Sequence, residues 1–344
     1  MSNADLYLLT TLLVYTGVAM VASWGLDLQI GETNVLNFGF ILFEAIGAYV
    51  TAILTLGPDT ANGGIQQYVF GAVLPFPVPW LVAMAVGAAL GLVVGLLTLR
   101  RLRGDYEAVV MLVMALVAFY AVSADTSLLN GSEGLSLIPA PFAGLVGGNP
   151  NTSMTYHWVY VGVVAFVCLL AYFVVRRITS APLGRALRAV RENDAVAMSL
   201  GKDAVRLRIL VQVVGGALGA LAGAMLVQWV GAWAPGAWTY PETFTLFAAI
   251  IVGGRANAAG VALGAIIVPG IILEGVIFLP TFGPSYLTPA LQWVLVGVLI
   301  IGFMWFRPQG IIPERRRHFP ALALAGGLDH VVTAGRAELE DERV

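Results

Sequence analysis

The feature of this sequence that most constrains its fold is a series of apolar runs long enough to cross a membrane. A helix of about 20 apolar residues spans the roughly 30 Å hydrocarbon core of a bilayer. Hydrophobic residues make up 59% of the chain and charged residues only 11%, a balance that excludes an ordinary soluble domain. The runs cover about residues 6–25, 36–56, 78–99, 107–124, 156–175, 207–230, 257–279 and 286–306, with a shorter run at about 243–253.

The basic residues orient these runs. Cytoplasmic loops of membrane proteins carry an excess of Lys and Arg. With the N-terminus outside and the C-terminus inside, and with the short run at least nearly crossing, all 18 basic residues fall on the cytoplasmic side. We therefore expect an all-α integral membrane protein, a polytopic helical bundle of about eight or nine spans with one short or broken helix. Residues 1–306 form the predicted transmembrane domain, and residues 307–344 a disordered cytoplasmic tail.

Two stretches interrupt the regular pattern of spans. The short run ends at Gly253-Gly254 and is too brief for a comfortable crossing, which predicts a re-entrant or broken helix of the kind that lines cavities in transporters. The stretch 25–40 separates two apolar runs with glycines and polar residues. It fits either a similar interruption or an ordinary cytoplasmic turn.

Glycines recur at intervals of four residues in several runs. Small residues allow helix backbones to approach closely, and in lipid this marks helix–helix contacts. These contacts would lie within one subunit or against another membrane subunit. The glycines concerned are Gly87, Gly91, Gly95, Gly215, Gly219, Gly223, Gly260 and Gly264.

Residues for enzymatic chemistry are sparse. The three histidines are far apart in sequence, the single cysteine Cys168 lies in an apolar run, and no metal-ligand spacing or histidine-based relay emerges. Lys202 is the only lysine, and no phosphate-binding loop precedes it. A net charge of -2 gives no nucleic-acid footprint. We therefore expect no catalytic residue, no metal site and no cofactor bound by this chain.

Two glutamates lie inside the predicted spans. An ionised carboxylate at the bilayer centre costs at least about 2.5–3.5 kcal/mol, so each should face the interior of the bundle or a wet cavity, or be protonated. Glu44 lies in the run 36–56 and Glu274 in the run 257–279. They could bind a substrate ammonium, attract a cation or transfer a proton. They could also be satisfied structurally by neighbouring hydroxyls and amides.

The segment 176–208 holds eight of the 18 basic residues and lies between two apolar runs. From Pro182 its apolar residues recur at helical spacing, and Gly201 is placed to end the helix. A short amphipathic helix on the cytoplasmic side, at about 182–201, is suited to receive force from a soluble partner.

Five blocks of the sequence together carry a resemblance to a known family. They are 181–193 (APLGRALRAVREN, continuing to Gly201), 34–49 (NVLNFGFILFEAIGAY), 104–106 (GDY) followed by 130–135 (NGSEGL), 251–254 (IVGG) with Gly260 and Gly264, and 307–311 (RPQGI). Taken in their order along the chain, over about residues 17–313, they resemble the LivM/LivH-type permeases of branched-chain amino-acid ABC importers, and the longer M-type subunit in particular. Urea and short-amide importers belong to the same family.

The resemblance implies a transport subunit without enzymatic activity in a prokaryotic inner (plasma) membrane. Its implied partners are a second, homologous permease, two cytoplasmic ATPases that bind ATP and Mg²⁺, and an external solute-binding protein. In this family the cytoplasmic loop inserts into a groove of the ATPase and transmits its closure. The corresponding coupling residues here are Gly184, Arg185, Arg188, Arg191, Glu192, Asn193 and Gly201.

The blocks also suggest where the translocation path runs. Two departures from the family pattern border it, since residues 37–40 (NFGF) replace a common Ser-Leu-Gly-His run and Glu44 replaces an apolar residue. A urea or amide permease, a proton-coupled secondary carrier and a membrane scaffold remain as alternatives. The path candidates are Asn34, Asn37, Glu44, Tyr49, Glu133 and Glu274.

Overall fold

The protein is helical throughout the part of the chain that the structure describes. The computed structural model describes residues 3–58, 66–100, 104–143, 153–275 and 287–314. These residues form one compact unit that ends at Pro313, and a second unit begins at Glu314. Of the predicted disordered tail 307–344, residues 307–313 belong to the compact unit, and residues 315–344 lie outside the described ranges.

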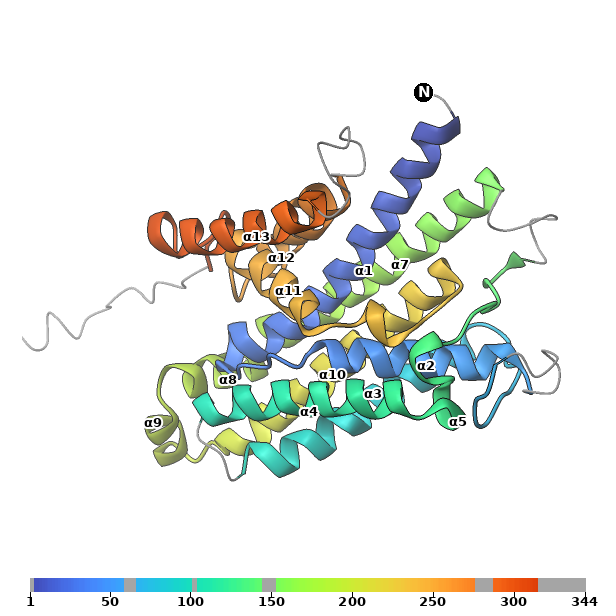
Figure 1. The fold of residues 1–344 in the computed structure, drawn as a ribbon. Helices are drawn as coiled ribbons and strands as arrows, with labels where there is room; N and C mark the ends of the chain where they lie inside the picture. Colours follow the sequence, from blue (N-terminus) through green and yellow to red (C-terminus); the bar gives the residue numbers. More distant parts are fainter. Residues whose placement is uncertain (1–2, 59–65, 101–103, 144–152, 276–286, 315–344) are drawn as a thin grey trace, which may run out of the picture. The chain divides into compact units, whose positions relative to one another are not determined.

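The predicted apolar runs coincide with helices (Figure 1). Five helices are long and apolar enough to cross a membrane: Asp5–Thr33, Val78–Thr98, Tyr106–Ala124, Met154–Ser180 and Ala204–Val230. Three shorter apolar helices, Ile41–Leu56, Ala258–Glu274 and Ala290–Phe306, accompany them. The helices are α1 (Asn3–Thr33), α2 (Ile41–Leu56), α3 (Val78–Thr98), α4 (Gly104–Ala124), α5 (Thr126–Leu129), α7 (Met154–Ser180), α8 (Pro182–Glu192), α9 (Asp194–Ser199), α10 (Ala204–Val230), α11 (Tyr240–Gly253), α12 (Ala258–Ala265) and α13 (Leu287–Phe306), with 3-10 turns η2 (Gly131–Glu133) and η3 (Pro235–Ala237) and a π-helix η4 (Ile266–Glu274).

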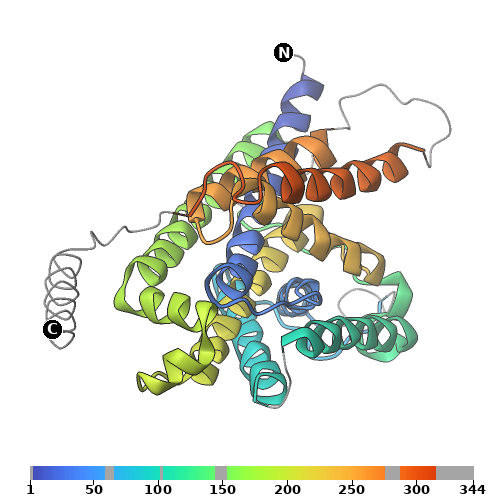
Figure 2. The same cartoon turned by 90° about the vertical axis from the view of Figure 1, so that its left-hand side faces the viewer.

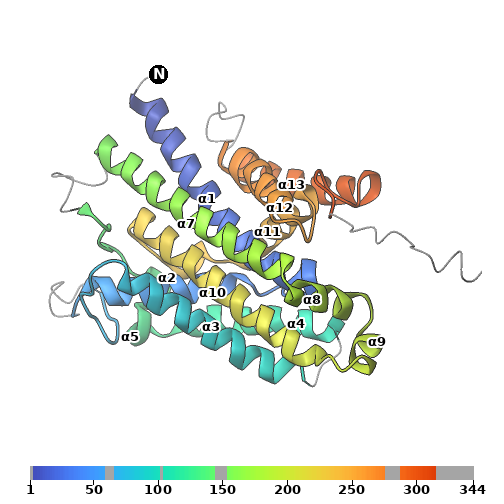
Figure 3. The same cartoon turned by 180° about the vertical axis from the view of Figure 1, so that it is seen from behind.

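Helix α10 lies at the centre of this bundle, packed by α1, α2 and α3. The glycine stripes produce this packing. Gly87 and Gly91 of α3 lie directly against the backbone of α10, and Gly47 of α2 lies against Ala220. The interpretation of the stripes as contacts within one subunit is thus confirmed at these positions. In Figure 2, α1 and α2 (blue) lie among the other helices, and in Figure 3 α10 lies between α3 and α7.

The stretch 25–40 contains a turn, but α1 continues through its first part. Gly25 does not interrupt the helix. Its lack of a side chain instead lets α1 approach the backbone of α10 at Gly215. The chain turns only after Thr33, where Asn34 adopts a left-handed φ of 58°. Asn37 then donates to the side chain of Gln29 and accepts from the backbone of Gly39. The turn between α1 and α2 is therefore held by buried amides.

The short run ends where the sequence suggests. Helix α11 stops at Gly253, and Gly254 has a φ of 118° that reverses the chain into α12. Gly253 and Gly260 then lie in close backbone contact, which pairs α11 with α12. The segment after α13 bonds to this reversal, because the amide of Ile311 donates to the carbonyl of Val252.

Candidate functional site

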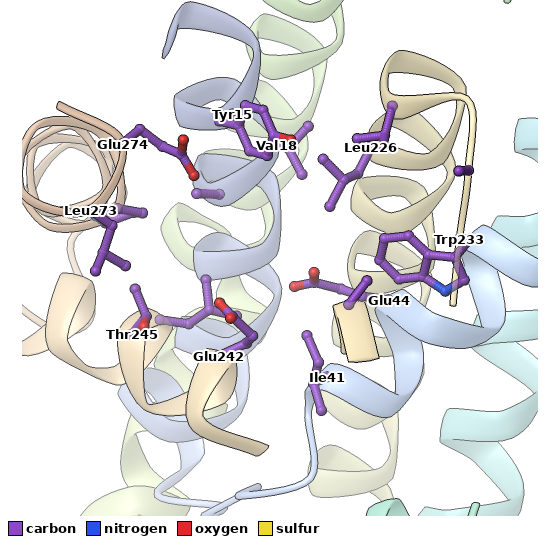
Figure 4. Close-up of a pocket in the computed structure, with 16 residues that line it drawn as sticks. Tyr15, Val18, Ile41, Glu44, Leu226, Trp233, Glu242, Thr245, Leu273 and Glu274 are labelled. Atoms are coloured by element: carbon purple, nitrogen blue, oxygen red, sulfur yellow. The ribbon is translucent and has the colours of Figure 1, made fainter. Parts of the chain in front are cut away.

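An acidic cavity lies between α1, α2, α10, α11 and η4. Its volume is about 290 Å³, the size of a site for a small solute. Figure 4 shows that Glu44 and Glu242 extend into this space from two helices and that Glu274 enters from a third element. The other lining residues are Tyr15, Val18, Ala19, Ile41, Leu226, Val230, Ala232, Trp233, Ala237, Thr245, Leu246, Pro269 and Leu273.

Local structure brings each of the three glutamates to the cavity. Glu44 lies in the first turn of α2, and Gly223 of α10 lets the backbone of α2 approach closely at this residue. Glu242 lies in the first turn of α11, and Thr245 follows it on the same helical face. Glu274 is the last residue of the π-helix η4, which contains Pro269.

The charges of the cavity are of one sign. Glu242 interacts electrostatically with both Glu44 and Glu274, and Glu274 also interacts with Tyr15. The lining described above contains no Lys, Arg or His. The positive ends of the α2 and α11 dipoles lie near Glu44 and Glu242 and compensate a small part of their charge. Glu274 lies at the end of its helix, where the dipole opposes a negative charge.

Three polar atoms in the wall of the cavity are buried without partners among the described residues. They are a carboxylate oxygen of Glu44, the hydroxyl of Thr245 and the indole nitrogen of Trp233. The residues are only 6%, 3% and 3% exposed. Buried polar groups normally have a hydrogen-bond partner, and an unsatisfied one costs about 1–3 kcal/mol. All three residues line the cavity, so a polar group that reached these atoms would remove that cost.

The structure brings together two of the six predicted path residues. Glu44 and Glu274 line the same cavity, whereas the other four lie elsewhere. Asn34 is exposed in the turn after α1, and Asn37 is buried in the amide contacts of that turn. Tyr49 is buried, and its hydroxyl accepts a hydrogen bond from Trp238. Glu133 is exposed in η2.

Glu242 is not among the predicted path residues. Its signal is an acid next to a short apolar run, followed at helical spacing by a threonine, but it lies one residue before the predicted run 243–253. Tyr15 and Thr245 were missed as well, because tyrosines and threonines in apolar helices are common and only the tertiary packing selects these two.

The predicted amphipathic helix at 182–201 is divided in two. Helix α8 ends at Glu192, and Asn193 is extended, with a φ of -158°. The Asn193 side chain accepts a hydrogen bond from the Val196 amide and so caps the start of α9. The expected single helix is therefore wrong at this residue, although Gly201 ends α9 with a left-handed φ of 75°, as predicted.

Helix α8 is attached to the end of α1. Arg188 forms an ion pair with Glu32 at 3.2 Å, and Arg191 donates to the carbonyl of Gly31 at 2.6 Å. Gly184 is buried against the backbone of Thr179, near the end of α7. Of the predicted coupling residues, Arg188, Arg191 and Gly184 thus position α8.

The remaining predicted coupling residues lie on the outer surface of α8 and α9. Arg185, Glu192, Asn193 and Gly201 are exposed. Apolar side chains accompany them, since Val196, Met198 and Leu200 are 55%, 54% and 72% exposed. Arg208 of α10 forms an ion pair with Asp194 at 2.8 Å, which attaches α9 to α10. Exposed apolar residues beside charged ones are typical of protein interaction sites.

A second, larger hollow does not resemble a solute site. It lies between α3, α7 and α10, and its volume is about 890 Å³. Its wall is made of aliphatic and aromatic side chains, including Trp80, Met84 and Phe166. A site for a small polar solute needs a few polar groups that fix its orientation, and this wall offers almost none. The acidic cavity is therefore the candidate site.

Comparison with known families identifies the class of the protein. The sequence profile of the family described as "Branched-chain amino acid transport system / permease component" matches residues 8–304. The chain belongs to this family. The match includes all the helices that line the cavity, together with α8 and α9. The resemblance seen in the five sequence blocks is thus confirmed.

The relatives of this permease include both subunit types. The "Probable branched-chain amino acid transport permease protein LivM" of Methanocaldococcus jannaschii is 26% identical, covering 90% of this chain and 94% of its own. LivM of Escherichia coli is 27% identical, covering 91% of this chain and 71% of its own. LivH of Escherichia coli is 26% identical, covering 91% and 97%. No solved structure matches the chain significantly.

Family membership and the apolar helices together establish a multi-pass membrane permease component. The findings match the main prediction from the sequence. They favour neither the urea or amide permease nor the proton-coupled secondary carrier.

Proposed function

We propose that the chain is one of two permease subunits of an ABC importer for branched-chain or related small amino acids in a prokaryotic inner membrane. Both LivM and LivH relatives exist, which supports pairing with a second, homologous permease. Two cytoplasmic ATPases bind ATP and Mg²⁺, and an external protein delivers the solute. This chain performs no covalent chemistry.

The observation that carries this proposal is the path of α1. Around the middle of α1, the side chains of Tyr15, Val18 and Ala19 line the acidic cavity. Glu32 holds α8 at the end of the same helix, about 25 Å from Tyr15 at 1.5 Å per residue. A helix is stiff over this length, so a displacement of α8 reaches the cavity wall directly.

The mechanism follows from these contacts. The N-terminus lies outside and the C-terminus inside, so that α8 and α9 face the ATPases. Closure of the ATPases upon ATP binding displaces α8 through Arg185, Glu192, Asn193 and Gly201, while Arg188 and Arg191 transmit the displacement to α1. The glycine contacts of α10 with α2 and α3 allow tightly packed helices to slide, which changes the side from which the cavity is reached.

Reconstitution in liposomes tests this function. The chain is assembled with its second permease, the ATPases and the solute-binding protein, and uptake of labelled leucine, isoleucine, valine and other small amino acids is measured. Uptake that requires both ATP and the binding protein is expected. Uptake driven by a proton gradient without nucleotide, or the absence of flux for every solute tested, would overturn the proposal.

A further inference from the structure

The acidic cavity has an unbalanced charge, and this imbalance constrains the solute. Glu44, Glu242 and Glu274 come from three separate elements and converge on about 290 Å³. Removing a carboxylate from water is costly unless it is paired, and like charges at close range add to that cost. The lining supplies no basic residue within the described chain. A positively charged group on a bound solute would relieve this cost, since the lining itself offers none.

A second observation points to a ligand independently of the acids. The Thr245 hydroxyl is buried, lines the cavity and has no hydrogen-bond partner among the described residues. It lies on α11 on the same face as Glu242, and Figure 4 shows both on one wall. A hydroxyl next to carboxylates can share the hydrogen atoms of one ammonium group with them.

A zwitterionic amino acid fits this cavity poorly. Its ammonium group would be stabilised, but its own carboxylate would lie among three others in a space that offers no Arg or Lys. A second ammonium group, as in a diamino acid, offsets this repulsion, and a diamine has no carboxylate and avoids it. Its amine can contact one glutamate while a second amine or an uncharged end contacts the rest.

We propose that this cavity binds the ammonium group of a solute with net positive charge, such as a small diamino acid or diamine. Glu44, Glu242 and Glu274 neutralise that charge, and Thr245 orients it. The apolar side chains of Val18, Ile41 and Leu226 contact the methylene chain of the solute. The inference rests on the proposed importer function, and it favours cationic solutes over the branched-chain amino acids named there.

A direct binding measurement tests the inference without the solute-binding protein, which would impose its own selectivity. The assembled permease–ATPase complex is placed in lipid nanodiscs, and binding of labelled cadaverine is measured. L-Lysine and L-norleucine then compete, because they share a backbone and a four-carbon side chain and differ by the terminal ammonium. We expect lysine to compete and norleucine not to.

Isosteric variants assign the effect to the cavity. Glu44→Gln, Glu242→Gln and Glu274→Gln should each weaken cadaverine binding by at least about tenfold, the usual scale for one charged hydrogen bond. Thr245→Val should weaken it less. Asp5→Asn, at the exposed start of α1, is the matched control and should change nothing.

Two results would overturn the inference. One is equal competition by norleucine and lysine, and the other is unchanged cadaverine binding in all three glutamine variants. ATP-dependent uptake of leucine by the same complex would then show that the importer function stands although its cationic selectivity does not. Loss of ATP-dependent uptake for every solute, including lysine, would instead count against the importer function.

Discussion

Arg188 donates a hydrogen bond at 3.2 Å to the carboxylate of Glu32, whose side chain is completely buried at the end of α1. The pair joins the segment that faces the proposed ATPases to the helix that lines the cavity. Arg188 also donates to the carbonyl of Thr179 at the end of α7. One guanidinium therefore holds three elements together.

Removing this guanidinium should loosen α8. Arg188→Ala removes one ion-pair partner of the buried Glu32, and we expect stability to fall by about 1–3 kcal/mol. Thermal unfolding of the purified complex measures this loss. Arg185→Ala, on the same helix but exposed, is the control and should unfold at the original temperature. Equal melting temperatures for both variants would contradict the positioning role.

The exposed coupling residues should act on the ATPases without affecting the fold. Glu192→Ala and Gly201→Asn should each lower solute-stimulated ATP hydrolysis several-fold at an unchanged melting temperature. Asparagine tolerates the left-handed conformation of Gly201, and the space around this residue is open, so the fold accepts the change. Unaltered ATP hydrolysis in both variants would remove these residues from the coupling surface.

The close approach of α2 and α10 should be sensitive to a single methyl group. A Cβ at Gly223 would collide with the backbone of Glu44, so Gly223→Ala should displace the carboxylate, reduce uptake and lower stability by about 1–3 kcal/mol. Gly162→Ala on α7 meets open space and is the matched control. Similar uptake and stability in the two variants would show that this contact can relax.

Single cysteines should report the orientation in the membrane. In a Cys168→Ala background, Leu200→Cys places an exposed thiol directly after α9, and Ser132→Cys places one in η2. A membrane-impermeant maleimide added to intact cells should label position 132, and position 200 should react only after the membrane is opened. The reverse pattern would invert the proposed topology.

Much of the fold could be predicted because apolar length and glycine spacing are local properties of the sequence. The break at Asn193 was missed because the apolar residues recur at helical spacing on both sides of it, although asparagine favours a helix cap over a helix interior. The continuation of α1 through Gly25 was missed for a related reason. A glycine that ends a helix and one that permits a close contact cannot be distinguished without the neighbouring helix.

The candidate site was only half predictable. Glu44 and Glu274 were found because a charge inside a long apolar run is conspicuous. Glu242 lies at the start of a short run beside proline and tyrosine, where an acid is ordinary. That the three meet depends on the packing of α2, α11 and η4, which no local pattern specifies.

The π-helix η4 places Glu274 at the cavity by means of helical register. A π turn accommodates an additional residue within an otherwise α-helical path. Glu274 is the last residue of η4, so the winding of these nine residues determines the direction in which its carboxylate points. If the same residues adopted ordinary α-helical winding, Glu274 would face another direction and turn away from Glu242. The charge of the cavity wall therefore depends on how tightly one segment is wound, and can change without any substitution among the glutamates.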